Sequence, residues 1–185
     1  MTTSQDKSTS FVLFGALGDL SLRKLMPAWY YLERSGLLED YLRILGVARP
    51  NITREQFQKK IIDALNLYVP GKYLDNDVCN NLIERINYCC CDLKNHDDYR
   101  KLEQSLNDWS KPISYYLAIP PDLFEVVCDC LYNIQILTKN SRIVVEKPIG
   151  YSLESSKDIH DKLLKHFNES QIYRIVTLIH TYIYV

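Results

Sequence analysis

The sequence predicts an α/β protein built on a Rossmann-like, doubly wound parallel sheet. Short apolar strands alternate with amphipathic helices along the 185-residue chain, which is the pattern of successive βαβ units. The strands are apolar throughout, as expected for a parallel sheet covered by helices on both faces. The first strand also ends in a glycine-containing turn that leads directly into a helix.

Composition and charge exclude several other classes of protein. At 46% hydrophobic and 24% charged residues, the chain is typical of a globular domain with a sizeable core. A net charge of −1 gives no electrostatic basis for binding nucleic acid or an anionic membrane surface. No apolar run is long enough to span a membrane, and residues 1–10 lack the apolar stretch of a secretory signal. We expect residues 1–10 to be a disordered lead-in and the protein to be cytoplasmic.

The first strand, Phe11 to Phe14, leads into a turn that contains Gly15 and Gly18. Glycines let a turn follow backbone angles that other residues avoid, and they let a ligand approach the backbone closely. The helix that follows presents unpaired N–H groups and a positive dipole end, which suit a pyrophosphate. The pattern therefore favours a dinucleotide site, although an ordinary strand-to-helix turn would also use glycine.

The next elements follow from periodicity and capping signals. A helix is predicted from Leu20 to Arg34, with Gly36 as its stop and Pro27 marking a kink or a late start. A second strand is predicted over Leu42 to Val47. Thr53 and Gln56 then form a capping box at the start of a helix. Beyond it we expect a helix over Val78 to Ile86, a strand over Ile86 to Cys90 and a helix over Asp97 to Leu106.

The C-terminal half continues the alternation. A strongly apolar strand from Ile113 to Ile119 ends in Pro120-Pro121, and an amphipathic helix from Leu123 to Tyr132 follows. A strand from Arg142 to Val145 closes in Glu146-Lys147-Pro148. The last predicted helix runs from Ser152 to Phe167.

The cysteines and histidines give no catalytic or metal-binding pattern. The six cysteines include no C-x-x-C pair, so we expect buried thiols and no metal site. We expect none of the four histidines to act as a general base, because none has a neighbouring serine, cysteine or carboxylate in a catalytic arrangement. The residues concerned are Cys79, Cys89, Cys90, Cys91, Cys128, Cys130, His96, His160, His166 and His180.

Unusual residues fall at the carboxyl ends of the predicted strands, where ligands bind in doubly wound sheets. They are Gly15 to Asp19, Arg49, Asp92, Pro120-Pro121 and Glu146-Lys147-Pro148. Arg49 follows the second strand, where an acidic residue would bind the ribose of NAD and an arginine can pair with the 2′-phosphate of NADP. Lys147 could hold a phosphate or a substrate hydroxyl. A solvated surface arginine and a structural Glu–Lys pair remain the alternatives.

Together these motifs resemble the glucose-6-phosphate dehydrogenase family over roughly Phe11 to Ile175. The motifs that carry the resemblance are Gly15-Ala16-Leu17-Gly18-Asp19-Leu20 with Arg23-Lys24, Val47-Ala48-Arg49, Ala118-Ile119-Pro120-Pro121, Arg142 to Gly150, Leu153 to Ser156, and Gln171 to Ile175. The resemblance implies an NADP-dependent enzyme that oxidises glucose 6-phosphate to the 6-phosphoglucono-lactone in the pentose phosphate pathway.

The resemblance also implies roles for individual residues. Lys147 would touch both the coenzyme and the sugar phosphate, and Pro148 would shape the path between them. The residues implied to bind NADP are Gly15, Ala16, Leu17, Gly18, Asp19, Leu20, Lys24, Arg49, Asp92, Leu93, Pro120, Pro121, Lys147 and Pro148. No metal is implied.

The chain departs from the family after Ile175. The family continues with Asp-His-Tyr-Leu-Gly-Lys, in which the histidine is the general base, whereas the matching position here is Thr177. A threonine cannot serve as a base at neutral pH, so no catalytic residue is predicted. We expect an NADP-binding domain over residues 11–175, an aberrant apolar tail over 176–185, and a truncation that removes the family's second α+β domain and most of its homo-oligomer interface.

Three functions therefore stay open. The first is a catalytically incomplete glucose-6-phosphate dehydrogenase, and the second is a non-catalytic NADP-binding module or remnant. The third is another sugar oxidoreductase of the glucose–fructose oxidoreductase type, which also ends a strand in Glu-Lys-Pro. The Gly-Asp-Leu turn and the Gln-Ile-Tyr-Arg-Ile run argue against the third.

Overall fold

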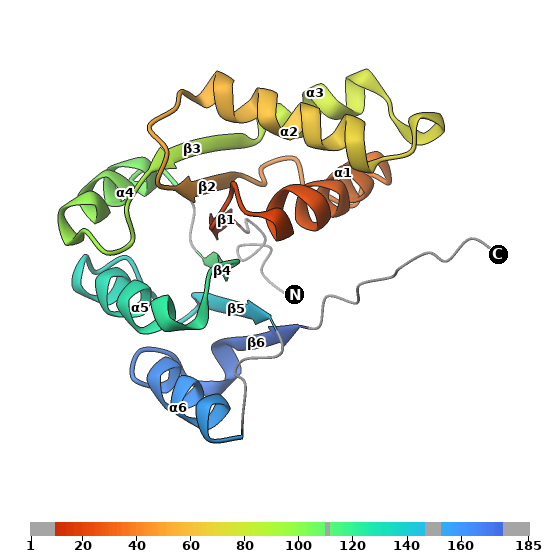
Figure 1. The fold of residues 1–185 in the computed structure, drawn as a ribbon. Coiled ribbons are helices and arrows are strands. Elements are labelled where there is room, and N and C mark those ends of the chain that lie inside the picture. The colour runs from red at the N-terminus through yellow and green to blue at the C-terminus, as the bar shows by residue number, and fades with distance from the viewer. Residues whose placement is uncertain (1–9, 110–111, 147–152, 176–185) are drawn as a thin grey trace, which may run out of the picture.

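The computed structural model describes residues 10–109, 112–146 and 153–175. In these ranges the chain forms one six-stranded sheet of order β3-β2-β1-β4-β5-β6, in which every neighbouring pair is parallel (Figure 1). The strands are β1 (Ser10–Phe14), β2 (Ile44–Ala48), β3 (Ile86–Cys90), β4 (Ile113–Leu117), β5 (Arg142–Glu146) and β6 (Ile172–Ile175). The predicted doubly wound parallel sheet is confirmed.

Helices connect the strands and cover both faces of the sheet. The α-helices are α1 (Met26–Arg34), α2 (Arg54–Tyr68), α3 (Asn76–Glu84), α4 (Tyr99–Leu106), α5 (Phe124–Asn133) and α6 (Leu153–Leu164). A π-helix, η1 (Ser21–Leu25), precedes α1, and the short 3₁₀ turns are η2 (Gly71–Tyr73), η3 (His96–Asp98), η4 (Pro121–Leu123) and η5 (Glu169–Gln171). In the described part of the chain, no helix is long and apolar enough to cross a membrane.

Alternating strand residues divide the core into two layers. Val12 and Phe14 of β1 pack with α4, α5 and α6 on one face of the sheet. Leu13, between them, packs with α1, α2 and α3 on the other face. This follows from the two-residue period of a strand, and it explains why the strands read as continuous apolar runs.

The order of the strands fixes where a ligand can bind. From β1 the chain builds outward to β2 and β3, and it then returns to add β4, β5 and β6 on the other side of β1. The register pairs Phe14 with both Val47 and Leu117, so the carboxyl ends of β1, β2 and β4 lie level. The reversal between β1 and β4 is the switch point at which doubly wound sheets leave a crevice for ligands.

The helix predicted from Leu20 to Arg34 is not one continuous α-helix. Met26 donates its N–H to the Ser21 carbonyl five residues earlier, which defines the π-helix η1. Pro27 then occupies the first turn of α1. Because Pro27 has no N–H, the α-helical ladder is interrupted at this point, and a change of helix type accommodates the gap.

Other predictions are confirmed with shifts at the element ends. The capping box of α2 forms, with Thr53 Oγ1 3.2 Å from the Gln56 N–H nitrogen and Gln56 Oε1 2.9 Å from the Thr53 nitrogen. Gly36 lies beyond the end of α1 at φ +63°, as a helix stop requires. The strand β6, which pairs with β5 at one edge of the sheet, was not predicted from the sequence.

Candidate functional site

A crevice of about 600 Å³ lies outside the carboxyl ends of β1, β2, β3 and β4. Its lining comes from the end of β2, from the segments that follow the four strands, and from η4: Gly15, Leu17, Gly18, Val47, Ala48, Arg49, Pro50, Cys91, Asp92, Leu93, Lys94, Ala118, Ile119, Pro120, Asp122 and Leu123. The crevice therefore forms at the switch point, where the topology predicts a ligand site.

The glycine turn after β1 packs tightly against the end of β4. Gly15 has φ +81°, and a Cβ at this position would lie 2.2 Å from the Ala118 carbonyl oxygen. The Gly15 and Ala16 N–H groups both donate to the Val47 carbonyl, at 3.0 and 3.1 Å. Gly15 is therefore required by the contact between strands, and these two N–H groups are already satisfied.

The groups available to an anion come from the start of the following helix. Gly18 donates its N–H to the Gly15 carbonyl at 2.9 Å, and the helical run begins at Asp19. The N–H groups of a first helical turn have no partner inside the helix and carry the positive end of its dipole. The fully buried Ser21 donates its hydroxyl to the Gly15 carbonyl at 2.9 Å and ties this helix to the turn.

Arg49 and Lys94 supply positive charge at the crevice. Both are exposed and line the crevice, from the loops after β2 and β3. Within the described ranges, no hydrogen bond or ion pair engages the Arg49 guanidinium. Lys94 was not predicted from the sequence: Arg49 directly follows β2, whereas Lys94 lies four residues beyond Cys90, the last residue of β3.

The loop that carries Lys94 is held by its own polar contacts. Asp92 accepts the Lys94 N–H at 3.0 Å and donates its own N–H to the Asp98 carboxylate at 2.9 Å. The hydrogen bond from Lys101, together with the Asp92 N–H, holds the pKa of Asp98 below its usual range. Burial raises the pKa of Cys91 to about 12, so this part of the crevice wall is a neutral thiol.

The structure brings half of the predicted cofactor residues together. Gly15, Leu17, Gly18, Arg49, Asp92, Leu93 and Pro120 line the crevice. Ala16, Asp19, Leu20, Lys24 and Pro121 do not line it: Ala16 is fully buried in the core, and Asp19 pairs with Arg23 at 3.3 Å. Lys147, Pro148, Thr177 and His180 lie outside the described residues. At the end of β5, Glu146 accepts the hydroxyl of Tyr116.

Two histidines contact side chains that are distant from them in the sequence. His166 Nε2 lies 2.6 Å from Asp129 Oδ1, and His96 Nδ1 lies 3.3 Å from Cys130 Sγ. These contacts could not be predicted from the sequence, because each joins residues that are far apart in it. That no histidine acts as a general base stays a prediction. Neither histidine lines the crevice. In the ranges that the structure describes, no group of three or more His, Cys, Asp or Glu side chains could hold a metal ion.

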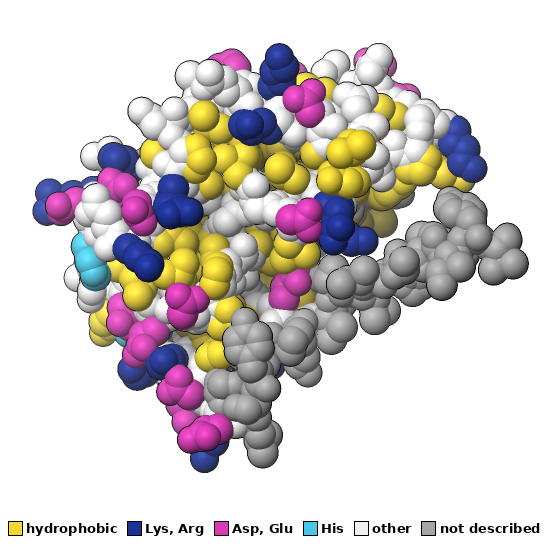
Figure 2. All heavy atoms as spheres, in the orientation of Figure 1, with side chains coloured by type: hydrophobic (Ala, Val, Ile, Leu, Met, Phe, Trp, Pro, Cys, Tyr) yellow, Lys and Arg dark blue, Asp and Glu magenta, His cyan; other side chains and the backbone are white. Residues whose placement is uncertain are grey.

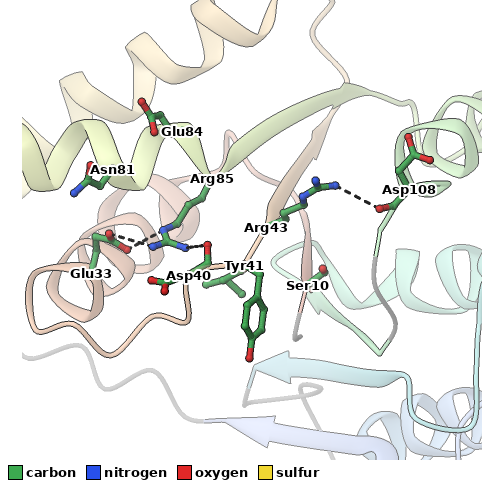
Figure 3. Close-up of a pocket in the computed structure, with 10 residues that line it drawn as sticks. Ser10, Glu33, Asp40, Tyr41, Arg43, Asn81, Glu84, Arg85 and Asp108 are labelled. Atoms are coloured by element: carbon green, nitrogen blue, oxygen red, sulfur yellow. Dashed lines mark hydrogen bonds and ion pairs between the residues drawn. The ribbon is translucent and has the colours of Figure 1, made fainter. Parts of the chain in front are cut away.

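A second pocket, of about 610 Å³, lies on the opposite side of the sheet from the crevice, at the amino ends of the strands (Figure 3). We call this side the amino edge, and the side of the crevice the carboxyl edge. Ser10 begins β1 there, and Arg43 and Arg85 directly precede β2 and β3. Arg85 Nε lies 3.0 Å from Glu33 Oε2 and forms an ion pair with it, although the geometry does not align a hydrogen bond between these two atoms. Arg85 Nη1 donates to two backbone carbonyls. The charge of Arg85 is thus neutralised within the protein, unlike that of Arg49.

Charged side chains of both signs are interspersed over the face shown in Figure 2, with no extended patch of one sign. This agrees with the net charge of −1. A net charge this small gives the chain no overall attraction for a polyanion, so anion binding rests on local groups. The strand order, the glycine turn and the local cations define the class of the protein as a Rossmann-type dinucleotide-binding domain.

Comparison with known proteins identifies the family. Residues 12–178 match the family model described as glucose-6-phosphate dehydrogenase, NAD binding domain. The chain therefore belongs to the glucose-6-phosphate dehydrogenase family, and the predicted resemblance is confirmed.

Similar proteins include several curated bacterial enzymes. The glucose-6-phosphate 1-dehydrogenase of Dickeya dadantii is 34% identical over 94% of this chain, and that of Zymomonas mobilis is 35% identical over 90%. A crystal structure of the Mycobacterium avium glucose-6-phosphate 1-dehydrogenase covers 91% of this chain at 33% identity with a TM-score of 0.83. A structure titled as a glucose-6-phosphate dehydrogenase complex with glucose 6-phosphate gives a TM-score of 0.82 at 30% identity.

The chain spans about 35% of the length of the curated relatives that it matches. What it shares with them is the N-terminal domain that binds a nicotinamide dinucleotide.

Proposed function

We propose that this chain binds NADP in the crevice and contributes the coenzyme half of a glucose-6-phosphate dehydrogenase site. The observation that carries the proposal is Arg49, an exposed guanidinium that lines the crevice at the end of β2. This is where the dinucleotide ribose binds in a sheet of this order, and a guanidinium can form a bidentate pair with a 2′-phosphate.

The rest of the coenzyme would follow the loops across the switch point. The N–H groups of the helical turn that begins at Asp19 would bind the pyrophosphate, and the Gly15–Gly18 turn would let it approach the backbone. Lys94 would add a second cation near the adenosine phosphate. Pro120, after β4, would line the nicotinamide side, as the family resemblance implies. When bound, NADP supplies a hydride acceptor.

The substrate side of the proposal rests on the family alone. By resemblance, Lys147 would touch both the coenzyme and glucose 6-phosphate, and Pro148 would shape the path between them. Thr177 occupies the position of the family's general base and cannot accept a proton at neutral pH. We therefore propose that residues 11–175 form the NADP-binding unit, that residues 176–185 add no catalytic group, and that these 185 residues alone bind coenzyme without turnover.

We also propose a reducing, cytoplasmic location for this unit. All six of its cysteines are free thiols. Unpaired buried thiols suit a compartment in which disulfides do not persist.

Calorimetric titration with NADP and NAD tests the coenzyme proposal. We expect NADP to bind more tightly than NAD. Arg49→Ala should weaken NADP binding by about 10- to 100-fold, which corresponds to losing a charge-assisted bidentate contact, and should leave NAD binding nearly unchanged. Arg43→Ala, at the opposite edge of the sheet, is the matched control and should change neither affinity. Equal affinities for NADP and NAD in the unmodified chain would refute the proposal.

A separate assay tests the absence of turnover. The chain is incubated with glucose 6-phosphate and NADP while the absorbance of NADPH is followed. Loss of a general base alone costs about 10²- to 10⁴-fold in rate, so we expect no signal above background. Robust NADPH formation would show that other residues supply the base.

A further inference from the structure

The loop that carries Arg49 is held from the neighbouring strand by a tyrosine. Tyr88, in β3, donates its hydroxyl to the Pro50 carbonyl at 2.6 Å and also lies 3.2 Å from the Ala48 carbonyl oxygen. These two carbonyls flank Arg49 in the sequence. A single side chain thus fixes the backbone on both sides of the residue that we assign to the 2′-phosphate.

Further contacts hold the same loop, Ala48 to Pro50. The Ala48 carbonyl also accepts the Cys91 N–H at 2.9 Å, and the Cys90 thiol lies 3.2 Å from the Arg49 carbonyl oxygen. Pro50 has no N–H, so backbone hydrogen bonds can hold this residue only through its carbonyl, which also accepts the Ile52 N–H at 3.0 Å. The Tyr88 hydroxyl is the strongest side-chain donor among these tethers, since a thiol donates weakly.

The Tyr88 ring is itself held in place by packing. Gly46 lies opposite Tyr88 in the register of β2 and β3. A Cβ at Gly46 would lie 2.5 Å from the Phe57 ring, so glycine admits that ring against the sheet. The Phe57 ring packs against the Tyr88 ring, with 4.8 Å between the two ring centroids. Burial raises the pKa of Tyr88 to about 12, so its hydroxyl keeps the proton that it donates.

We propose that Tyr88 is a positioning residue that sets the preference for a 2′-phosphorylated dinucleotide by holding the Ala48–Pro50 backbone and hence Arg49 at the crevice. An arginine on a freely moving loop would lose more conformational freedom on binding phosphate, and the ordered backbone removes part of that cost. NAD lacks the 2′-phosphate and gains nothing from this ordering. The proposal rests on the function proposed for Arg49.

The test compares Tyr88→Phe with the unmodified chain by calorimetric titration with NADP and with NAD. Phe keeps the ring packing and removes only the hydroxyl. We expect the Kd for NADP to rise about 3- to 10-fold, which corresponds to the net free energy that one hydrogen bond contributes. The Kd for NAD should change less than about twofold.

Tyr30→Phe is the matched control. The Tyr30 hydroxyl donates to the Tyr73 carbonyl in η2 at 2.7 Å and accepts the Asp75 N–H at 2.8 Å, and none of these residues lines the crevice. This variant should lose stability without changing the ratio of the two affinities. In the double variant Arg49→Ala with Tyr88→Phe, the effect of Tyr88 should vanish, because it acts through Arg49.

The outcomes separate this proposal from the proposed function. If the unmodified chain does not prefer NADP, the proposed function fails. If it prefers NADP and Arg49→Ala removes that preference, but Tyr88→Phe leaves it intact, then the positioning role alone is overturned. Equal weakening of NADP and NAD by Tyr88→Phe, or an undiminished effect of Tyr88 in the double variant, overturns it as well.

Discussion

Gly15 shows how one residue serves both the fold and the site. Its positive φ turns the chain at the end of β1, and its missing side chain lets the turn lie against the Ala118 carbonyl. The sequence predicted that this glycine lets the backbone turn and lets a ligand approach it closely. The structure shows that the contact between β1 and β4 also requires glycine here, whether or not a ligand is bound.

The prediction at this position is a large loss of stability in Gly15→Ala. The new Cβ would lie 2.2 Å from a backbone oxygen, so both strands must shift, and the φ of +81° adds strain. We expect the free energy of unfolding, from urea titration, to fall by more than about 3 kcal/mol.

Gly36→Ala is the matched control for this change. Gly36 also has a positive φ, of +63°, but nothing lies within 4 Å of its added Cβ. Only backbone strain of about 1–2 kcal/mol is expected there. If the two variants lose equal stability, the steric account of Gly15 is wrong.

Single residues could be predicted where they follow a strand and carry an unusual side chain. Arg49 was found in this way, whereas Lys94, which lies four residues beyond the end of β3, was not. The contacts of His166 with Asp129 and of Tyr88 with Pro50 could not be predicted, because they join residues far apart in the sequence. Such pairs depend on how the helices and strands pack.

Whole elements were predicted best where local chemistry determines them. The capping box of Thr53 and Gln56 depends on four consecutive residues and forms as predicted. The π-helix η1 was missed, since Pro27 indicates a break in an α-helix but not the kind of helix that precedes it. The strand β6 is short and lies at an edge, so its pairing with β5, rather than its own periodicity, identifies it.

A second prediction concerns the ion pair that joins α1 to the start of β3. The Glu33 and Arg85 side chains are only 10% and 15% exposed. Glu33→Ala would leave a nearly buried guanidinium with backbone partners only, at an expected cost of about 2–3 kcal/mol in unfolding free energy.

The exposed pair of Asp19 and Arg23 provides the comparison for this prediction. Its side chains are 72% and 44% exposed. Asp19→Ala should change the unfolding free energy by less than about 0.5 kcal/mol. A loss as small in Glu33→Ala would show that the ion pair of Glu33 and Arg85 adds little to stability.

At the scale of the whole molecule, the two edges of the sheet differ in chemistry. At the amino edge, Glu33 neutralises Arg85 and the Arg43 guanidinium donates to the Asp108 carbonyl, whereas at the carboxyl edge no hydrogen bond or ion pair of the Arg49 side chain is formed among the described residues. The fold class and the crevice could be predicted because strand order and strand ends follow general rules. The division of charge between the edges could not, because it depends on which side chains meet.

A third prediction concerns the pH dependence of the whole fold. Burial raises the pKa of the Cys91 and Cys128 thiols to about 12, whereas an unfolded thiol titrates near 8.5. The unfolded chain therefore loses protons that the folded chain keeps. Stability is full below about pH 8.5 and falls as pH rises toward 12, by about 2 kcal/mol per thiol at pH 10.

Urea unfolding at neutral pH and at pH 10 measures this loss. Cys128→Ala should be less stable than the unmodified chain at neutral pH because it leaves a cavity. It should also lose about 2 kcal/mol less between the two pH values. An unchanged pH dependence in this variant would contradict the role of the buried thiol.

The central claim, that the carboxyl-edge crevice is the NADP site, is tested most directly by following backbone amide NMR signals during titration with NADP. We predict that signals from Gly18 to Leu20, around Arg49, and from Asp92 to Lys94 shift together and saturate with one Kd. Signals from Arg43, Arg85 and Asp108, at the amino edge, should stay in place. Shifts confined to the amino edge, or no shifts at saturating NADP, would contradict the account.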